Sequence, residues 1–404
     1  MSVRAVLLVA LAAAWAVACW LLLRTAVPGG LELPPVNVDA LFGRRFVERA
    51  ENYERFLYVS WFLSQAVLVV TLGLYARYGA RFTQESAAGR IGTGMLLGML
   101  GFGFVWLSQL GFGLAGLWWE RRHDLTETGY LEWALSNWGV LGGEFLAVCL
   151  ALVIVMGLAG PFGDRWWIPG AAVFIALGAT FAFAFPYLPG GDTEPLRDER
   201  LVAASERFQR EQGIDGVPVR VEKVSDDTRM VNAYAAGYGP SRRIVLWDTL
   251  LDEFPRRQVE VVLAHEIGHH SSNHILKGVA WYALFAVPGT YLLARLTRRR
   301  GGMRQPEAVP LSLLVLVVLQ LLALPVTNWI TRRMEAEADW KALQSTRDPT
   351  AASGAFRGLA RTSLGDPAPP LLLHLVLDSH PSLADRDAMA AALPRLRHRD
   401  AVGE

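Results

Sequence analysis

Residues 262–269 read Val-Leu-Ala-His-Glu-Ile-Gly-His, within an apolar-periodic helix that we expect over residues 257–273. Side chains four residues apart share one helix face, so His265 and His269 can bind a single metal ion, and zinc accepts that geometry. Glu266 would then lie beside the metal without coordinating it, where it can act as a general base toward water. Such a short motif also occurs by chance, so a metal site needs support from a further ligand.

A second helical motif, residues 332–339, reads Arg-Arg-Met-Glu-Ala-Glu-Ala-Asp. A catalytic zinc site takes two histidines and one carboxylate and leaves a position for water, and Glu335 can supply the carboxylate. Asp339 lies one turn further on the same face, where it can accept the free ring N–H of a ligand histidine. A solvated charged helix would explain the charges but not this spacing. The pattern predicts one Zn²⁺ per chain, bound by His265, His269 and Glu335.

The apolar residues, 52% of the 404, gather in long runs. A helix needs about 20 apolar residues to cross the hydrocarbon core of a bilayer. Seven runs meet this length and predict seven transmembrane helices, at residues 3–23, 58–75, 91–118, 138–160, 166–188, 278–296 and 309–330. The chain is therefore expected to be a multi-pass protein in contact with the lipid bilayer.

Two polar stretches interrupt the apolar runs. The first contains a helical pattern over residues 196–212 and strand patterns over 218–224 and 243–247, which predict a small sheet. The second continues the last apolar run as a helix over residues 328–343. The predicted fold is mainly α, a polytopic membrane protein with a zincin-like catalytic domain and a small β-sheet. Its expected parts are a membrane region (1–188), a first catalytic part (189–277), a membrane hairpin (278–330) and a second catalytic part (331–404).

Charge and cysteine content exclude other classes of protein. The chain has 39 Lys and Arg against 38 Asp and Glu, so it lacks the basic footprint of a nucleic-acid-binding protein. Its two cysteines, Cys19 and Cys149, lie far apart in apolar runs and do not have the spacing of a thiolate zinc site. Any metal must therefore use nitrogen and oxygen ligands.

These motifs, in this order and spacing, resemble the integral-membrane zinc proteases that include the type 1 CAAX prenyl protease and the bacterial heat-shock membrane protease. The type 1 CAAX prenyl protease is the closer of the two. The resemblance also rests on residues 231–234 (Val-Asn-Ala-Tyr), on residues 243–251, and on His380-Pro381 followed by Arg386. It implies a zinc-dependent endopeptidase with peptide or protein substrates, including membrane-associated ones, in the cell (inner) membrane with its catalytic face cytoplasmic. The numbers of Lys and Arg on the two sides of the predicted membrane helices are nearly equal, so the positive-inside rule does not decide the orientation.

The same resemblance implies roles for further residues. Asn232, Ala233 and Tyr234 would belong to an edge strand that binds extended substrate through its main chain. His380 and Arg386 would hold substrate or the oxyanion of the tetrahedral intermediate. Asn232 could equally be an ordinary turn residue, and His380 could cap a helix beside Pro381.

Two other functions compete with this interpretation. His265, His269, His270 and His274 mimic a histidine box of a membrane di-iron oxygenase or desaturase, but such sites need several boxes, and only four other histidines remain in the chain. A catalytically inactive membrane scaffold is the third possibility. The intact Glu266 argues against it.

Overall fold

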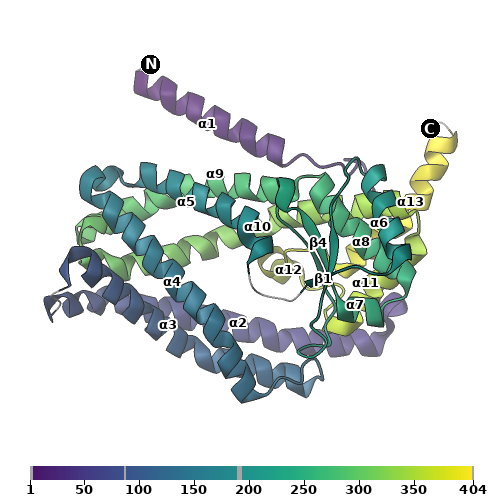
Figure 1. The fold of residues 1–404 in the computed structure, drawn as a ribbon, viewed down its shortest axis with the longest axis horizontal. Helices are drawn as coiled ribbons and strands as arrows, with labels where there is room; N and C mark the ends of the chain where they lie inside the picture. The colour runs from purple at the N-terminus through teal and green to yellow at the C-terminus, as the bar shows by residue number, and fades with distance from the viewer. Residues whose placement is uncertain (1–2, 86–87, 189–192, 403–404) are drawn as a thin grey trace. The chain divides into compact units, whose positions relative to one another are not determined.

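The computed structural model describes the backbone of residues 3–85, 88–188 and 193–402. The described residues are mainly helical and include one four-stranded sheet. Figure 1 shows the helices and the strands as a ribbon. The chain forms two compact units, the first made of residues 1–55, 179–281 and 325–404, and the second of residues 56–178 and 282–324. The predicted combination of a helical membrane protein with a small sheet is confirmed.

Six helices among the described residues are long and apolar enough to cross a membrane. The candidate spans are Asp39–Phe82, Gly89–Arg122, Tyr130–Arg165, Trp167–Tyr187, His274–Arg300 and Pro306–Thr346. The first predicted run forms α1 (Val3–Leu22), whose apolar part with described side chains is Ala12–Leu22. The structure therefore supports six of the seven predicted crossings, and the crossing by α1 stays a prediction.

The second unit contains α3 (Gly89–Arg122) and α4 (Tyr130–Phe162), most of α2 (Arg44–Tyr78) and α5 (Trp167–Ala184), and parts of α9 (His274–Thr297) and α10 (Val309–Thr346). Helices α3 and α4 pack closely because glycines on α3 leave room. A Cβ on Gly98 would lie 2.2 Å from Cδ1 of Leu152. Small residues at helix interfaces are typical of membrane bundles, where burial from water does not drive association.

The first unit holds the sheet, in the order β1-β2-β4-β3. Strand β1 (Thr193–Pro195) runs antiparallel to β2 (Val219–Glu222), and β2 runs parallel to β4 (Arg243–Trp247). Strand β3 (Ala233–Ala236) pairs antiparallel with β4 and forms one edge of the sheet. The predicted strand regions at 218–224 and 243–247 are confirmed, and β1 is an addition that the sequence pattern did not indicate.

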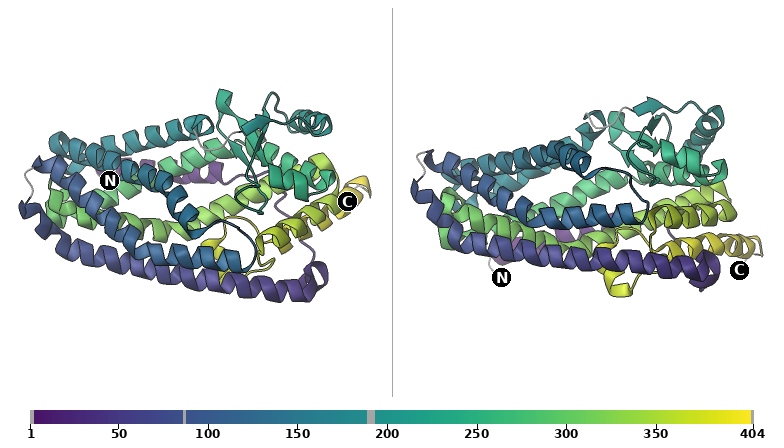
Figure 2. Two further views of the ribbon diagram at one scale, coloured as in Figure 1. Left: turned by 60° about the horizontal axis from the view of Figure 1, so that its bottom comes forward. Right: turned by 90° about the horizontal axis from the view of Figure 1, so that it is seen from below.

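The sheet packs against α6 (Glu199–Glu211) and α8 (Arg256–Ser271), which lie beside it in Figures 1 and 2. The core between them is built from fully buried side chains, among them Phe208, Ile244, Leu246, Leu263 and Ile267. Helix α6 begins three residues later than expected. Its N-cap is Asp198, whose side chain accepts hydrogen bonds from the N–H groups of the first turn.

The second polar stretch completes this unit. Helix α10 continues past its apolar run to Thr346, as predicted for residues 328–343. It is followed by α11 (Pro349–Ser363), α12 (Leu371–Leu377) and α13 (Leu383–Val402), while the short α7 (Asp248–Glu253) precedes α8. Trp340, Leu343, Phe356 and Met389 form a buried cluster with Val261 of α8.

Helices α8 and α10 pack closely against each other at Gly268. A Cβ on this residue would lie 3.0 Å from Cα of Ala338 and 3.2 Å from its carbonyl oxygen. Both neighbours are backbone atoms of a helix, so they cannot move aside as a flexible side chain can. A glycine is therefore required here for the two helices to keep this separation.

We predict that Gly268→Leu destabilises the protein by about 1–3 kcal/mol, the usual cost of overpacking a closely packed site. Thermal unfolding of the purified protein in detergent measures the change. Gly278→Leu on α9 is the matched control, because a Cβ at Gly278 meets nothing within 4 Å. Equal unfolding temperatures for the two variants would contradict the close packing described here.

Candidate metal centre

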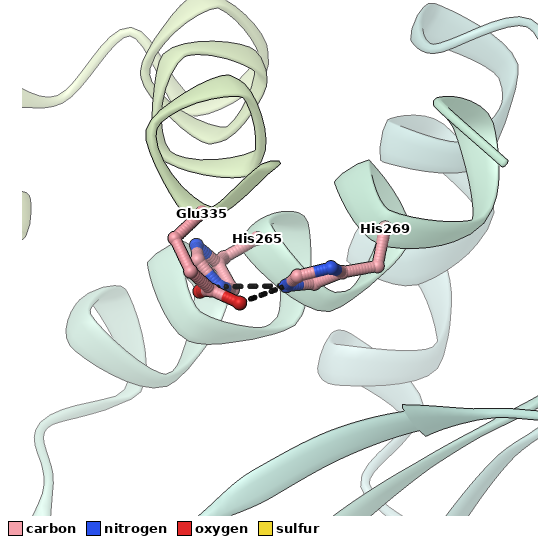
Figure 3. A group of neighbouring side chains, drawn as sticks. All are labelled: His265, His269 and Glu335. Carbon is pink, nitrogen blue, oxygen red and sulfur yellow. Dashed lines mark hydrogen bonds and ion pairs between the residues drawn. The ribbon is translucent and has the colours of Figure 1, made fainter. Parts of the chain in front are cut away.

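Two helices of the first unit bring three possible metal ligands together, as Figure 3 shows. His265 and His269 lie one turn apart on α8, and Glu335 reaches them from α10. The ligand atoms of the three side chains all lie within 4.8 Å of one another. The Nε2 atoms of His265 and His269 are 3.1 Å apart.

The arrangement fits a tetrahedral cation. Ligands about 2.0–2.1 Å from a tetrahedral zinc are about 3.3–3.4 Å from each other. The Nε2 atom of His265 lies 3.2 Å from Oε2 of Glu335, and Nε2 of His269 lies 3.5 Å from Oε1. Oε2 of Glu335 is buried and has no hydrogen-bond partner among the described residues. A buried carboxylate oxygen is costly to leave unsatisfied, and a cation between the three side chains would satisfy it.

Asp339 holds the other side of the His265 ring. Its Oδ1 lies 2.8 Å from Nδ1 of His265, which leaves Nε2 facing Glu335. Burial disfavours the charged form of His265, yet the Asp339 and Glu335 carboxylates outweigh it and raise its pKa to about 10. The two carboxylates therefore favour a positive charge at this position, which a bound cation would supply. The structure places Asp339 where the sequence predicted it, beside a histidine of the site.

Arg386 of α13 lies behind Asp339. Its Nε donates to Oδ2 of Asp339 at 2.8 Å, and its NH2 group donates to Oδ1 at 2.6 Å. The guanidinium also lies over the ring of Phe356, 4.5 Å from its centroid. The contact with substrate or oxyanion that the resemblance implied for Arg386 stays a prediction, and the structure shows that this side chain also orients Asp339.

Glu266 follows His265 on α8 and is buried. Burial raises the pKa of this carboxyl, and the nearby His265 and His269 rings offset the effect only in part. A carboxylate whose pKa is raised toward neutrality is better matched to proton transfer near pH 7. The position and environment of Glu266 are compatible with a general base.

His380 lies at the rim of the site. Its Nε2 is 3.3 Å from Oε2 of Glu335, while its side chain is 57% exposed. On the other side of the ring, Nδ1 lies 3.1 Å from the Ser379 hydroxyl. The structure thus brings His380 to the three grouped side chains, with a ring nitrogen next to the position where a cation would lie.

Asn232 immediately precedes the edge strand β3, and Ala233 and Tyr234 begin it. The Asn232 carbonyl accepts a hydrogen bond from Trp247 N–H at 3.0 Å, and its side-chain oxygen accepts one from Ala233 N–H at 2.9 Å. The Tyr234 hydroxyl donates to Glu222 of β2. Ala233 and Tyr234 therefore lie in the edge strand and Asn232 lies directly before it, while substrate binding by these residues stays a prediction.

The remaining histidines of α8 and α9, His270 and His274, do not join the group of three potential ligands. His270 is buried, and its Nε2 lies 3.0 Å from the Arg243 carbonyl oxygen, with burial lowering its pKa to about 4. His274, at the start of α9, lies with Nδ1 3.0 Å from Nδ1 of His269 and with Nε2 3.1 Å from Glu337. The sequence patterns did not single out Glu337 for any role.

Two histidines and an adjacent glutamate on one helix, facing a glutamate on a second helix within a multi-pass chain, are an arrangement typical of membrane metalloproteases. Residues 195–393, just under half of the chain, match the sequence pattern of Peptidase family M48. The family implies a bound metal, which agrees with the grouping of His265, His269 and Glu335.

Two relatives and one solved structure are similar to this chain. The uncharacterized metalloprotease YhfN of Bacillus subtilis is 29% identical over 256 residues, 60% of this chain and 60% of that protein. A CAAX prenyl protease 1 homolog of Arabidopsis thaliana is 29% identical over 216 residues, 49% of this chain and 45% of that protein. The crystal structure of S. mikatae Ste24p shares the fold, with a TM-score of 0.65, 18% identity, and coverage of 94% of this chain and 96% of that one. The two sequence matches thus span less than two thirds of either relative.

We predict that Asp339→Asn lowers the affinity for the metal by about 10- to 100-fold, because the His265 ring loses the acceptor that orients it. The variant also leaves Arg386 buried without a charged partner, so the unfolding temperature should fall as well. Competition with a chromophoric chelator measures the affinity on folded protein. Asp252→Asn, at an exposed position of α7, is the control. Unchanged metal affinity in Asp339→Asn would rule out this role of Asp339.

Proposed function

We propose that this protein is a zinc-dependent membrane endopeptidase similar to the type 1 CAAX prenyl protease. The grouping of His265, His269 and Glu335 around a buried carboxylate oxygen without a hydrogen-bond partner is the observation that carries the proposal. Two imidazoles and one carboxylate are the ligands of many catalytic zinc sites. When bound there, zinc would polarise the substrate carbonyl and lower the pKa of water.

Residues of the chain would then carry out proton transfer and stabilise the oxyanion. Glu266 takes a proton from the attacking water and passes it to the leaving amine, as a buried carboxylate with a raised pKa is suited to do. His380, with Nε2 3.3 Å from Glu335, donates to the oxyanion that develops on the carbonyl. Arg386 acts mainly through Asp339, which it contacts with two hydrogen bonds.

The edge strand β3 provides a surface for an extended peptide. Antiparallel pairing alternates between residues that face the partner strand and residues that face away. Since the Asn232 carbonyl bonds to β4, the backbone groups of Ala233 and Ala235 face the open edge of the sheet. The Ala233 N–H is taken by the Asn232 side chain, which leaves the Ala233 carbonyl and both groups of Ala235 for a substrate strand.

The broader features of the proposal follow from the same resemblance. The substrates are peptides or proteins, including membrane-associated ones, and no nucleic acid is involved. Residues 189–277 and 331–404 would form the two parts of the catalytic domain, and residues 1–188 and 278–330 the membrane region. We place the chain in the cell inner membrane with this domain on the cytoplasmic side.

The di-iron oxygenase is less well supported. His270 contacts a backbone carbonyl and His274 contacts His269 and Glu337, so neither ring faces the position of a cation. Among the described residues, His265, His269 and Glu335 are the single group of three or more potential ligands. A second iron would lack ligands there.

We predict that Glu266→Gln lowers peptidase activity by about 10² or more while metal content and unfolding temperature stay at wild-type values, because the substitution removes the base and keeps the shape. Cleavage of a fluorogenic peptide and metal analysis on the same sample measure the two effects. The matched control is Glu260→Gln, two turns earlier on α8, where the side chain pairs with Arg207 and Arg256 instead of the site. Full metal-dependent activity in Glu266→Gln would show that the proposed mechanism is wrong.

A further inference from the structure

The connection between α8 and α9 brings the ring of His274 into contact with the ring of His269. Helix α8 ends at Ser271 and α9 begins at His274. Between them, Asn273 has a positive φ of 55°. Asparagine is among the few residues that tolerate this left-handed conformation. In an uninterrupted helix, His274 would lie about 140° around the axis from His269. The break at Asn273 instead allows the two rings to meet.

The contact between these rings continues to a carboxylate. Nδ1 of His274 lies 3.0 Å from Nδ1 of His269, and Nε2 of His274 lies 3.1 Å from Oε2 of Glu337. The side chains of His274 and Glu337 are only 3% and 7% exposed. Two hydrogen bonds therefore connect His269 to Glu337 through a second imidazole in a buried environment.

Glu337 is itself fixed by two further donors. Lys277 Nζ lies 3.1 Å from the same oxygen that His274 contacts. The other oxygen of Glu337 accepts a hydrogen bond at 2.9 Å from the backbone N–H of Ala26, in the segment that follows α1. A carboxylate held by three donors on both oxygens has little freedom to rotate.

One assignment of protons satisfies every contact. If Nε2 of His269 presents its lone pair to a cation, Nδ1 of His269 carries the proton and donates it to Nδ1 of His274. Neutral His274 must then carry its proton on Nε2, where it donates to Glu337. The same logic applies to His265, whose Nδ1 faces Asp339 directly. Both histidines of the site are thus oriented by a carboxylate, one directly and one through His274.

We propose that His274 and Glu337 are positioning residues that fix the ring orientation and the tautomer of His269, so that its Nε2 faces the metal. This inference rests on the proposed function, because it takes the grouped side chains to be a metal site. Carboxylates that orient a ligand histidine raise its affinity for the metal. His270 has no such role, since its ring contacts the Arg243 carbonyl.

The test is the zinc affinity of the purified full-length protein, measured by competition with a chromophoric chelator. We expect His274→Phe and Glu337→Gln each to weaken zinc binding by about 10- to 100-fold. His274 and Glu337 act through one chain of hydrogen bonds. The zinc affinity of the double variant should therefore be about that of whichever single variant binds zinc less tightly. His270→Phe is the matched control, the same substitution at a neighbouring buried histidine, and should retain wild-type zinc affinity. Glu253→Gln on the exposed face of α7 controls for the loss of one carboxylate.

The thermal stability of the metal-free protein separates positioning from a purely structural role. A structural role would lower the unfolding temperature of the metal-free variants and leave the zinc affinity of the folded protein unchanged, and that result would overturn the inference. The inference would also be overturned if the double variant lost zinc affinity by the product of the two single-variant factors. If His274→Phe does not fold, the zinc affinity of Glu337→Gln alone tests the inference. Wild-type protein that binds no zinc would overturn the proposed function and this inference together, whereas wild-type affinity in both variants overturns the inference alone.

Discussion

Helices α8 and α10 meet where Gly268 faces the backbone of Ala338, and the geometry of the candidate site depends on this contact. The three potential ligands come from these two helices, so the distance between the helix axes sets the distance between the histidines and Glu335. Gly268 lies inside the His-Glu-x-x-His motif itself, three residues after His265. The motif therefore supplies both the metal-binding side chains and the space that the second helix needs.

The same contact concentrates charge in a buried region. Glu335, Glu337 and Asp339 lie within five residues of α10 and are all buried, and each carboxylate would be costly without partners. Asp339 is balanced by Arg386, and Glu337 by Lys277 and a backbone N–H. Glu335 instead faces ring nitrogens of His265, His269 and His380, the nearest 3.2 Å away, and its Oε2 makes no hydrogen bond among the described residues. The distribution of partners thus singles out Glu335 as the carboxylate that faces a cation.

Much of this arrangement could be predicted because it depends on local periodicity. The four-residue spacing of His265 and His269 and the Glu335 to Asp339 spacing follow directly from the helical repeat, and β2, β4 and the extension of α10 follow from apolar patterns. The link from His269 to His274 could not be predicted in this way, since it depends on a left-handed residue between two helices. Glu337 was missed because its role appears only when the segment after α1 is in place. The pairing of Arg386 with Asp339 likewise requires the packing of α13, which no local pattern specifies.

The match of residues 195–393 to Peptidase family M48 and the geometry of the site lead to one central claim, that a single zinc ion is held by two imidazoles and one carboxylate. X-ray absorption spectroscopy of the purified protein tests this claim most directly, because it reports the element, its ligands and any neighbouring metal. The account predicts a zinc edge, about four nitrogen or oxygen ligands near 2.0–2.1 Å with scattering from two imidazole rings, and no metal–metal distance. Iron with a second iron nearby, or zinc with scattering from fewer than two imidazoles, would contradict it.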